Sequence, residues 1–325
     1  MPCKVWAILP LLLVYGCARH SNGTASIGTS GSTAIEEQND AVFASHRGGR
    51  DVTREFTQRF YAATSNQNGA SSKAIEGCDI LLVHGWLGET AIRLTHFLDG
   101  LNCNQRTLDY LKDQRYAAGE MGLCSMAPPF RSEAVCLCGE KIARLIASNP
   151  RQVIIVSHSK GCLDTLEALL RLQRDGQLNK VKGWISLQGP LYGSEEAATF
   201  LNHSNFVGKL RIKLLGARIE GLHDMTPIVR EEYMACHRTE IDAVVHALPI
   251  LCFASWKTPV CPNELLSDGH VEPERAILPG ADYIAKSGVS HAIPVISRKA
   301  EYFDRITFTK TLLAMLSDRI EQSPE

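Results

Sequence analysis

The sequence predicts an α/β fold in which a mainly parallel central sheet is flanked by helices. From Cys78 onward, short apolar strings alternate with stretches of helical periodicity. Parallel strands need crossover connections of about a dozen residues or more, which helices usually supply. At 325 residues, 45% of them hydrophobic, the chain can bury a large core.

The expected elements follow one another in that alternating order. The strings are predicted to be strands because they are short, apolar and rich in β-branched or aromatic residues. The intervening stretches are predicted to be helices because their apolar residues recur every three or four positions. We expect strands over 79–85, 152–158, 181–189, 250–256 and 281–288, and helices over 132–149, 162–174 and 304–320.

The alternation falters between about 191 and 246. Within this segment Thr226 is an N-cap candidate and Pro227 suits the first position of a helix. Two interpretations stay open: the segment is a candidate cap over a site, or it is an irregular surface excursion.

The N-terminus resembles an export signal. Lys4 precedes an apolar run over 5–15 that is too short to span a bilayer as a helix. The sequence VYGC resembles the lipobox of bacterial lipoproteins, which implies lipidation at Cys17. An ordinary cleaved signal and a buried N-terminal helix are the alternatives. We therefore predict a signal peptide over 1–16 and a location in the bacterial cell envelope, lipid-anchored at the outer membrane or periplasmic face, or otherwise periplasmic or secreted.

Residues 17–40 have the composition of a flexible tether. They are rich in Ser, Thr, Gly and Asn and contain few large apolar residues. The folded body is expected over 41–325, with 191–246 as its candidate cap.

The net charge argues against nucleic acid as a partner, and the cysteine spacing argues against a zinc site. The formal net charge of −1 and the lack of a basic stripe argue against nucleic acid. Cys136 and Cys138 are separated by one residue and Cys236 adjoins His237, spacings that do not suit a zinc site. We expect no metal and no cofactor.

The exported body has an odd number of cysteines. Removing the two N-terminal cysteines from 11 leaves nine (11 − 2), so at least one stays unpaired in a monomer. An exported chain can form disulfides. On separation alone the candidate pairs are Cys252 with Cys261 and Cys103 with Cys124, but sequence does not settle the connectivity.

Small residues crowd the joint between the strand at 152–158 and the helix that follows it. The sequence over 157–161 is SHSKG. A sharp strand-to-helix turn that thrusts out a nucleophile needs small residues two positions before and after it. Centring the turn on Ser159 meets that demand, whereas centring it on Ser157 would place Ile155 in a small-residue position. Ser159 is therefore the candidate nucleophile, and the Lys160 amide is a candidate oxyanion donor.

A second oxyanion donor is expected after the first strand. The sequence VHGWLGE places glycines just beyond an apolar strand, where a loop can approach the nucleophile. The Trp86 N–H is the preferred donor and Leu87 is the alternative. His84 is interpreted as a residue that orients this loop and not as a base.

Serine needs a base, and the base needs an acid group to orient it. Asp268 lies in a Ser-Asp-Gly turn after the strand at 250–256, and His291 follows the last strand. Both are therefore expected at the carboxyl edge of the sheet, where sites of α/β proteins gather. The rival acids are Asp224, Asp282 and Asp304, and the rival histidines are His158, His223, His237 and His270.

These motifs resemble the α/β-hydrolases, specifically bacterial lipases and esterases. The resemblance rests on VHGWLG, SHSKG, SLQGPLYGS, SDGHV and GVSHAIPV, and the order Ser159, Asp268, His291 is the order of that superfamily. It implies an α/β-hydrolase fold with Asp268 and His291 as the acid and the base. The sequence departs from the pattern at Ser157, which replaces a glycine, and at Cys162, where lipases often have a second glycine.

The resemblance implies a serine hydrolase of carboxylic esters that works through an acyl-enzyme. Lipid esters are the expected substrates, with the membrane as a partner, because the predicted envelope location and the lipase-like motifs favour them. The apolar residues expected at the rim of the site agree with this; they are Trp86, Leu87, Leu191 and Tyr192. Alternatives on the same fold are an acyltransferase and a polyester depolymerase. A non-catalytic binding or structural protein of the envelope is the alternative from another class.

Overall fold

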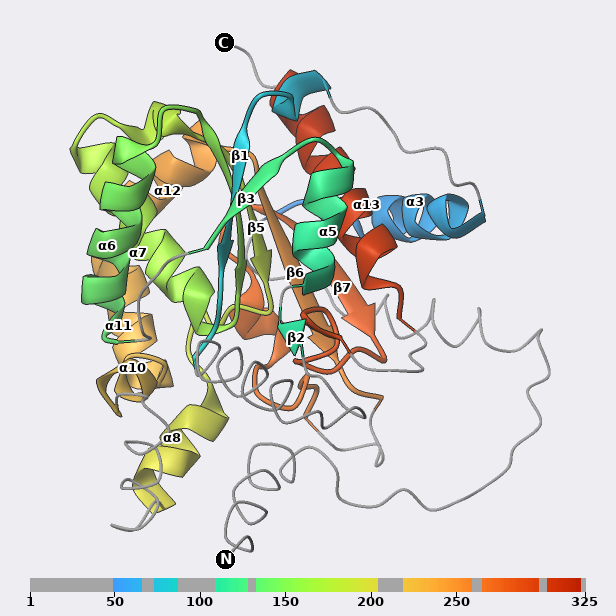
Figure 1. The fold of residues 1–325 in the computed structure, drawn as a ribbon. Helices are drawn as coiled ribbons and strands as arrows, with labels where there is room; N and C mark the ends of the chain where they lie inside the picture. The colour runs from blue at the N-terminus through green and yellow to red at the C-terminus, as the bar shows by residue number, and fades with distance from the viewer. Residues whose placement is uncertain are drawn as a thin grey trace, which may run out of the picture. The chain divides into compact units, whose positions relative to one another are not determined.

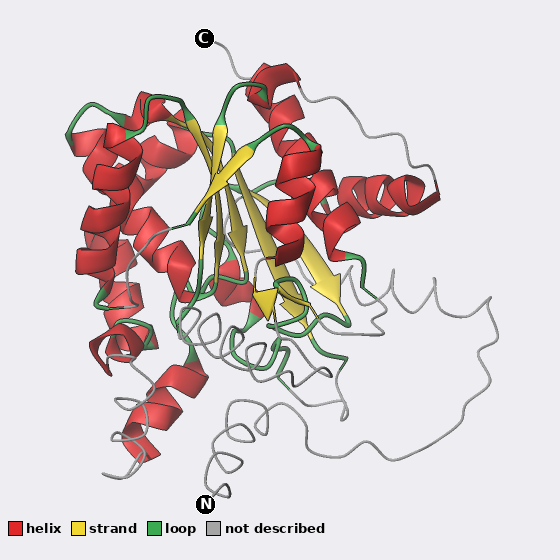
Figure 2. Ribbon diagram, in the orientation of Figure 1, coloured by secondary structure: helices red, strands yellow, loops and turns green. Residues whose placement is uncertain are grey.

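A sheet of parallel strands forms the centre of the protein (Figures 1 and 2). The computed structural model describes residues 49–65, 73–86, 109–110, 112–127, 133–203, 219–258, 265–297 and 303–322. In these residues the sheet has six strands in the order β3-β1-β4-β5-β6-β7, all paired in parallel. The strands are β1 (Asp79–Val83), β3 (Cys124–Met126), β4 (Val153–His158), β5 (Val181–Leu187), β6 (Ile250–Trp256) and β7 (Asp282–Ser287). The predicted fold class is confirmed.

The middle of the sheet is buried on both faces. Every residue of β1, β4 and β6 is buried, which explains why these strands are near-continuous apolar runs without a polar face. Successive side chains of a strand point to opposite faces. Leu81 and Ile155 accordingly belong to one hydrophobic cluster, and their neighbours Ile80 and Ile154 belong to the other.

Helices cover both faces of the sheet (Figure 1). One hydrophobic cluster contains buried residues of α6, α7, α11 and α12, and the other contains residues of α3, α5 and α13. The bounds are α3 (Thr53–Ser65), α5 (Lys112–Glu120), α6 (Val135–Ser148), α7 (Lys160–Arg174), α11 (Pro227–Cys236), α12 (Arg238–Ala247) and α13 (Arg305–Gln322). Short 3-10 turns occur at Lys73–Ile75, Leu178–Lys180 and Pro273–Ala276.

Several elements were not predicted from the sequence. They are α3, α5, the edge strand β3, and the antiparallel pair of β2 (Asp109–Tyr110) and β8 (Ile296–Ser297). The ring of Phe56 in α3 packs at 5.8 Å from that of Phe308 and 6.2 Å from that of Phe253. Long-range aromatic packing of this kind docks α3 and leaves little local trace in the sequence.

The segment 191–246 contains helices in its described part. These are α8 (Glu195–His203), α10 (Ile219–His223), α11 and α12. Pro227 is the first residue of α11 and Thr226 precedes it, as predicted. The Thr226 hydroxyl does not cap the helix, because it donates to the His223 carbonyl at 2.9 Å. That this segment acts as a cap stays a prediction.

The predictions for the N-terminus and for the disulfides concern residues that the structure describes only in part. The predicted signal peptide over 1–16, Cys17 and the tether over 17–40 all lie outside the described residues. Within the described ranges no helix is long and apolar enough to cross a membrane. Of the candidate disulfides, Cys103 and Cys261 lie outside the described residues, and their proposed partners Cys124 and Cys252 are free thiols in the structure.

Candidate active site

Ser159 occupies a strained turn between β4 and α7. Its backbone has φ 55° and ψ −130°, a conformation that residues other than glycine rarely adopt. The Ser159 N–H donates to the Leu187 carbonyl of the neighbouring strand at 2.9 Å. The side chain is partly exposed although the residues on either side of it are buried. The turn therefore presents Ser159 at the carboxyl edge of the sheet.

The small residues around Ser159 are explained by close contacts. A Cβ atom on Gly161 would lie 2.6 Å from the His84 carbonyl oxygen and 2.8 Å from that of Val83, so the start of α7 can approach the end of β1 only with glycine there. At Ser157 the hydroxyl accepts a hydrogen bond from Trp184 Nε1 at 2.7 Å and donates to Cys162 Sγ at 3.3 Å. Both departures from the lipase pattern are therefore accommodated.

The Ser157 hydroxyl gives a prediction for stability. Ser157→Gly would leave the buried Trp184 indole N–H without its acceptor, which should lower the free energy of unfolding by about 1–3 kcal/mol. Urea denaturation measures the loss. Introducing Trp184→Phe together with Ser157→Gly removes the unpaired donor, so the double variant should lose less than the sum of the single losses. Simple additivity would contradict this role.

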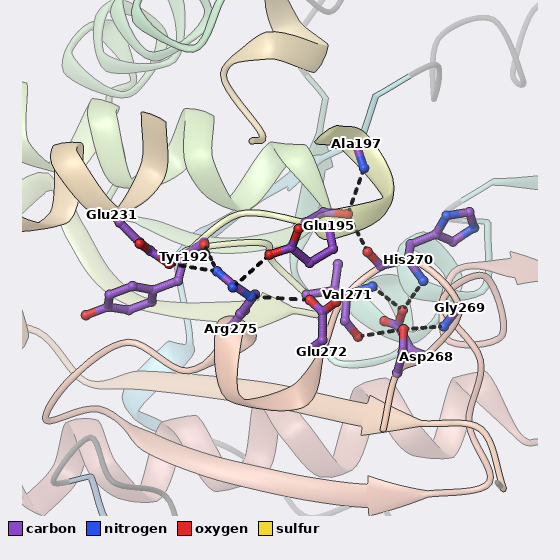
Figure 3. Close-up of polar contacts among 12 residues, drawn as sticks. Tyr192, Glu195, Ala197, Glu231, Asp268, Gly269, His270, Val271, Glu272 and Arg275 are labelled. Atoms are coloured by element: carbon purple, nitrogen blue, oxygen red, sulfur yellow. Dashed lines mark hydrogen bonds and ion pairs between the residues drawn. The ribbon is translucent and has the colours of Figure 1, made fainter. Parts of the chain in front are cut away.

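Asp268 and His291 form a hydrogen-bonded pair. His291 Nδ1 lies 2.8 Å from Asp268 Oδ2, and the His291 N–H donates to the Asp268 carbonyl at 3.0 Å. Asp268 Oδ1 accepts the amide N–H groups of His270 at 2.9 Å and Val271 at 2.8 Å (Figure 3). The carboxylate is 1% exposed. It can therefore fix the tautomer of His291, with a proton on Nδ1 and the lone pair on Nε2.

His158 links the His291 loop to the elbow. Its Nε2 donates to the His291 carbonyl at 2.9 Å, and the two ring centroids are 4.6 Å apart. Because His158 immediately precedes Ser159, this bond links the loop of the Asp268–His291 pair to the turn that carries Ser159. Between the described residues, no hydrogen bond joins Ser159 Oγ to His291. In unliganded sites of this type such bonds are often long and tighten only with substrate.

Burial favours the neutral form of His158. Burial lowers its pKa well below the ordinary value, and the neighbouring His291 lowers it further. A neutral His158 would not repel a positive charge on the neighbouring His291 ring. The sequence offered His158 only as a rival to His291 and did not indicate this positioning role.

The two expected oxyanion donors, Trp86 and Lys160, belong to segments that adjoin Ser159. A Cβ atom on Gly85 would lie 2.8 Å from Ser159 Cβ and 3.3 Å from its Oγ, so the chain leading to Trp86 passes directly against the nucleophile. Lys160 is the first residue of α7, where an amide has no preceding turn to accept it. Leu87 lies outside the described residues.

The rival acids have other partners. Asp224 Oδ2 accepts the Val135 N–H at the start of α6, and Asp304 Oδ1 accepts two amides at the start of α13. Asp282 pairs with Arg50 and Arg319. In each case the carboxylate stabilises a helix start or joins surface elements, and none of these bonds involves His291.

Two of the rival histidines, His270 and His237, have polar partners other than Asp268. His270 Nδ1 pairs with Glu196, and the His270 ring contacts the edge of His291 with centroids 4.9 Å apart. His237 Nδ1 contacts the Tyr233 carbonyl at 2.9 Å, and its ring stacks on the Tyr233 ring. His223 is the last residue of α10.

The acid turn is tied to the segment after β5 (Figure 3). The Ser194 hydroxyl donates to the His270 carbonyl at 2.5 Å. Arg275 Nη1 donates to the Tyr192 carbonyl at 2.6 Å and to Glu231 at 3.0 Å, and its Nη2 donates to Glu195 at 3.1 Å. The sequence did not reveal this network, because its members come from three segments that are far apart in the chain.

The His270–Glu196 pair gives a prediction for pH. Burial lowers the pKa of His270, but the hydrogen bond and charge of Glu196 raise it more, so the pKa lies above its ordinary value. A raised pKa means that the stabilisation is complete at low pH and is lost as pH rises through the folded-state pKa. The melting temperature difference between wild type and Glu196→Gln should therefore be larger near about pH 5.5 than near about pH 8.5. Glu76→Gln, an exposed control, should show no such trend; a constant difference for Glu196→Gln would contradict the prediction.

The expected apolar rim is only partly present. Leu191 was wrongly assigned to the rim, because it is 0% exposed and its carbonyl accepts Arg230 Nε at 3.2 Å. Trp86 and Tyr192 are partly buried hydrophobic residues packed against the core cluster of α6 and α7. In the described ranges, no group of three or more His, Cys, Asp or Glu residues could hold a metal ion.

Comparisons with known proteins bear on the fold. Residues 139–227, which include Ser159, match the lecithin:cholesterol acyltransferase family. A metagenomic carboxyl esterase has a similar structure, with a TM-score of 0.61 and 15% identity over 97% of this chain and 99% of that one. The mature form of a Bacillus licheniformis lipase gives a TM-score of 0.50 and 16% identity over 77% and 91% of the two chains. No curated protein has a significantly similar sequence. By its parallel sheet, its serine elbow and these likenesses, the chain is an α/β-hydrolase in fold.

Proposed function

We propose that the chain is a serine hydrolase of carboxylic esters, of the lipase or esterase type. One observation carries the proposal: buried Asp268 pairs with partly exposed His291, and this pair is tied to the turn that holds Ser159 in a strained, partly exposed conformation. Backbone strain of this kind is characteristic of functional positions. The fold and the partial match to an acyltransferase family support chemistry on esters.

In the proposed acylation step, Ser159 Oγ attacks the ester carbonyl carbon and its proton moves to His291 Nε2. Asp268 stabilises the imidazolium through Nδ1. The amides of Trp86 and Lys160 donate hydrogen bonds to the carbonyl oxygen and stabilise the negative charge that develops on it. Collapse of the tetrahedral intermediate breaks the bond to the alcohol, which leaves with the proton from Nε2. The acyl group remains on Ser159.

Deacylation repeats these steps with a new nucleophile. If water enters, His291 takes its proton and the products are a carboxylic acid and free Ser159. If an alcohol enters, the acyl group passes to it and a new ester forms. Acyl transfer is the second candidate function, and the match of residues 139–227 to lecithin:cholesterol acyltransferase favours it.

Lipid esters are the proposed substrate class. The support is the lipase among the structural neighbours and the match to an acyltransferase whose family name refers to a phospholipid. Trp86, beside the site, adds an apolar surface. The envelope location and the lipid anchor at Cys17 are proposed from the sequence of the N-terminus. The alternatives are polyester cleavage and a non-catalytic binding role. The experiment below distinguishes both of them from lipid-ester turnover.

Turnover of a series of p-nitrophenyl esters tests the proposal. The full chain is assayed with acyl groups from two to sixteen carbons, with and without a mixed-micelle interface and a long-chain alcohol. Release of p-nitrophenol that exceeds the Ser159→Ala background supports an esterase, and a longer preferred acyl group supports lipid substrates. Formation of an alkyl ester in place of free acid indicates transfer. A folded wild type without turnover on any ester, including an aliphatic polyester, would contradict an enzymatic function.

A further inference from the structure

We propose that Gln188 is a positioning residue for His291. Its side-chain amide donates a hydrogen bond to Nδ1 of His158 and accepts one from the Ser255 hydroxyl. This keeps the proton of the His158 ring on Nε2, the nitrogen that contacts the His291 carbonyl. The role rests on the proposed function, because His291 acts as a base only if Ser159 attacks an ester.

Gln188 has a strained backbone that its residue type does not explain. Its φ is 51°, and among the described residues other than glycine it shares a positive φ only with Ser159. Glycine would meet this backbone demand without strain. Strained residues that are not glycine cluster at functional sites. A long polar side chain at this position therefore needs a reason of its own.

The strained residue lies beside the elbow. The carbonyl of the preceding residue, Leu187, accepts the Ser159 N–H at 2.9 Å, and the Gln188 N–H donates to the Phe253 carbonyl of β6 at 2.8 Å. These bonds place Gln188 at the carboxyl edge of the sheet, between the ends of β4 and β6. The residue is 0% exposed, so its amide must find hydrogen-bond partners within the protein.

The tautomer of His158 follows from its contact with His291. A carbonyl oxygen can only accept a hydrogen bond, so Nε2, at 2.9 Å from the His291 carbonyl, carries the proton. Burial keeps the pKa of His158 well below its ordinary value, so the ring holds no second proton. Nδ1 therefore has a lone pair and needs a donor. The Gln188 side chain is a hydrogen-bond partner of this ring.

One orientation of the Gln188 amide leaves a buried group unsatisfied. In it, Nε2 lies 2.6 Å from Oγ of Ser255, a buried residue of β6, and Oε1 has no hydrogen-bond partner among the described residues. With Oε1 toward the His158 ring, the amide favours a second ring proton and raises the His158 pKa, but burial lowers that pKa more. A neutral ring has no donor for this oxygen.

The other orientation satisfies every polar group of the contact. Half a turn of the amide exchanges its oxygen and nitrogen without changing its shape, so the hydrogen bonds decide between the two. Nε2–H then donates to His158 Nδ1, and Oε1 accepts the Ser255 hydroxyl. The 2.6 Å separation at Ser255 is short for an N–H···O bond and ordinary for an O–H···O bond. The hydrogen bonds then run in one direction, from Ser255 to the His291 carbonyl.

The direction of these bonds matters for the base. If the His158 proton moved to Nδ1, the lone pair of Nε2 would face the oxygen of the His291 carbonyl. The bond that ties the His291 loop to the elbow would then be lost. A displacement of about 1 Å at a reacting group can cost about 10²-fold in rate.

Gln188→Met removes the donor and keeps the length of the side chain. We expect kcat to fall by about 10- to 10²-fold with KM changed less than about threefold. Gln58→Met, at an exposed position of α3, is the matched control. Histidine-selective ¹⁵N NMR reads the tautomer directly, with the His158 signal assigned by its loss in His158→Gln. Wild type should carry the proton on Nε2, and Gln188→Met should show protonated Nδ1.

Gln188→Glu provides a pH profile that a merely structural role would not move. A protonated acid can donate to Nδ1 as the amide does, whereas a carboxylate only accepts and draws the His158 proton to Nδ1. Burial can raise the pKa of a glutamic acid to about 8–9. The kcat/KM of Gln188→Glu relative to wild type should therefore fall about tenfold or more between about pH 5.5 and 9. His291 and His270, whose charges act on His158, are present in both proteins, so their titrations cancel in the ratio.

A ratio that is constant or rises with pH, unchanged kcat in Gln188→Met, or a wild-type His158 protonated on Nδ1 overturns the inference. If neither Gln188 variant folds, NMR of wild type decides it: a scalar coupling across the hydrogen bond between Gln188 Nε2 and His158 Nδ1 is expected, and its absence overturns the role. Wild type without ester turnover would instead defeat the proposed function, whereas these NMR signals do not depend on turnover.

Discussion

Replacing Ser159 or His291 with alanine is expected to lower kcat for ester turnover by about 10⁴-fold or more while the protein stays folded. In the proposed mechanism Ser159 supplies the attacking oxygen, and His291 receives its proton. Residues that act as one unit are strongly non-additive, so the double variant should be no slower than either single variant by more than about tenfold. Steady-state kinetics with a p-nitrophenyl ester, together with circular dichroism, measure both quantities.

Asp268→Asn completes this test. The amide would present a donor or a weaker acceptor to His291 Nδ1, which favours the wrong tautomer, and kcat should fall by roughly 10³- to 10⁴-fold. Asp282→Asn is the matched control, because Asp282 binds two arginines and not His291. Equal losses of activity in these two aspartate variants would contradict the role of Asp268. Multiplicative losses when Ser159→Ala and His291→Ala are combined would contradict their action as one unit.

Gly85→Ala is the second change for which a large effect is expected. Its new Cβ would lie 2.8 Å from Ser159 Cβ and 3.3 Å from Oγ, distances that require the nucleophile or the loop to move. Displacement of about 1 Å can cost about 10²-fold in rate. We expect kcat to fall by about 10²-fold or more, with a loss of about 1–3 kcal/mol in the free energy of unfolding.

Gly119→Ala is the control for this substitution. A Cβ on Gly119, inside α5, meets nothing within 4 Å. Alanine is the better helix former, so this variant should keep full activity and gain up to about 1 kcal/mol of stability. If Gly85→Ala is folded and as active as Gly119→Ala, the loop after β1 does not lie against the nucleophile as described.

Much of the fold could be predicted from local patterns. The strands β1, β4, β5, β6 and β7 are buried apolar runs, and the sequence placed them to within a few residues. The edge strand β3 has three residues and no fully buried position, so it carries no comparable signal. α3 is held by aromatic contacts with β6 and α13, which are distant in sequence.

The candidate site, like the fold, could be predicted from the sequence only in part. Ser159, Asp268 and His291 could be singled out because each lies in a recognisable turn after a predicted strand. The residues that hold these turns together could not. His158 contacts the backbone of His291, 133 positions away, and Arg275 binds the Tyr192 carbonyl, 83 positions away. Such bonds depend on the approach of loops, which no local pattern encodes.

The central claim is that Ser159 is an activated nucleophile. The most direct measurement is intact-mass analysis of the full chain after exposure to a fluorophosphonate, followed by peptide mapping. We expect one adduct, at Ser159, that is absent in Ser159→Ala, forms at least about 10²-fold more slowly in His291→Ala, and does not form after denaturation. An adduct at another residue, or none on folded wild type with and without a lipid interface, would contradict the account.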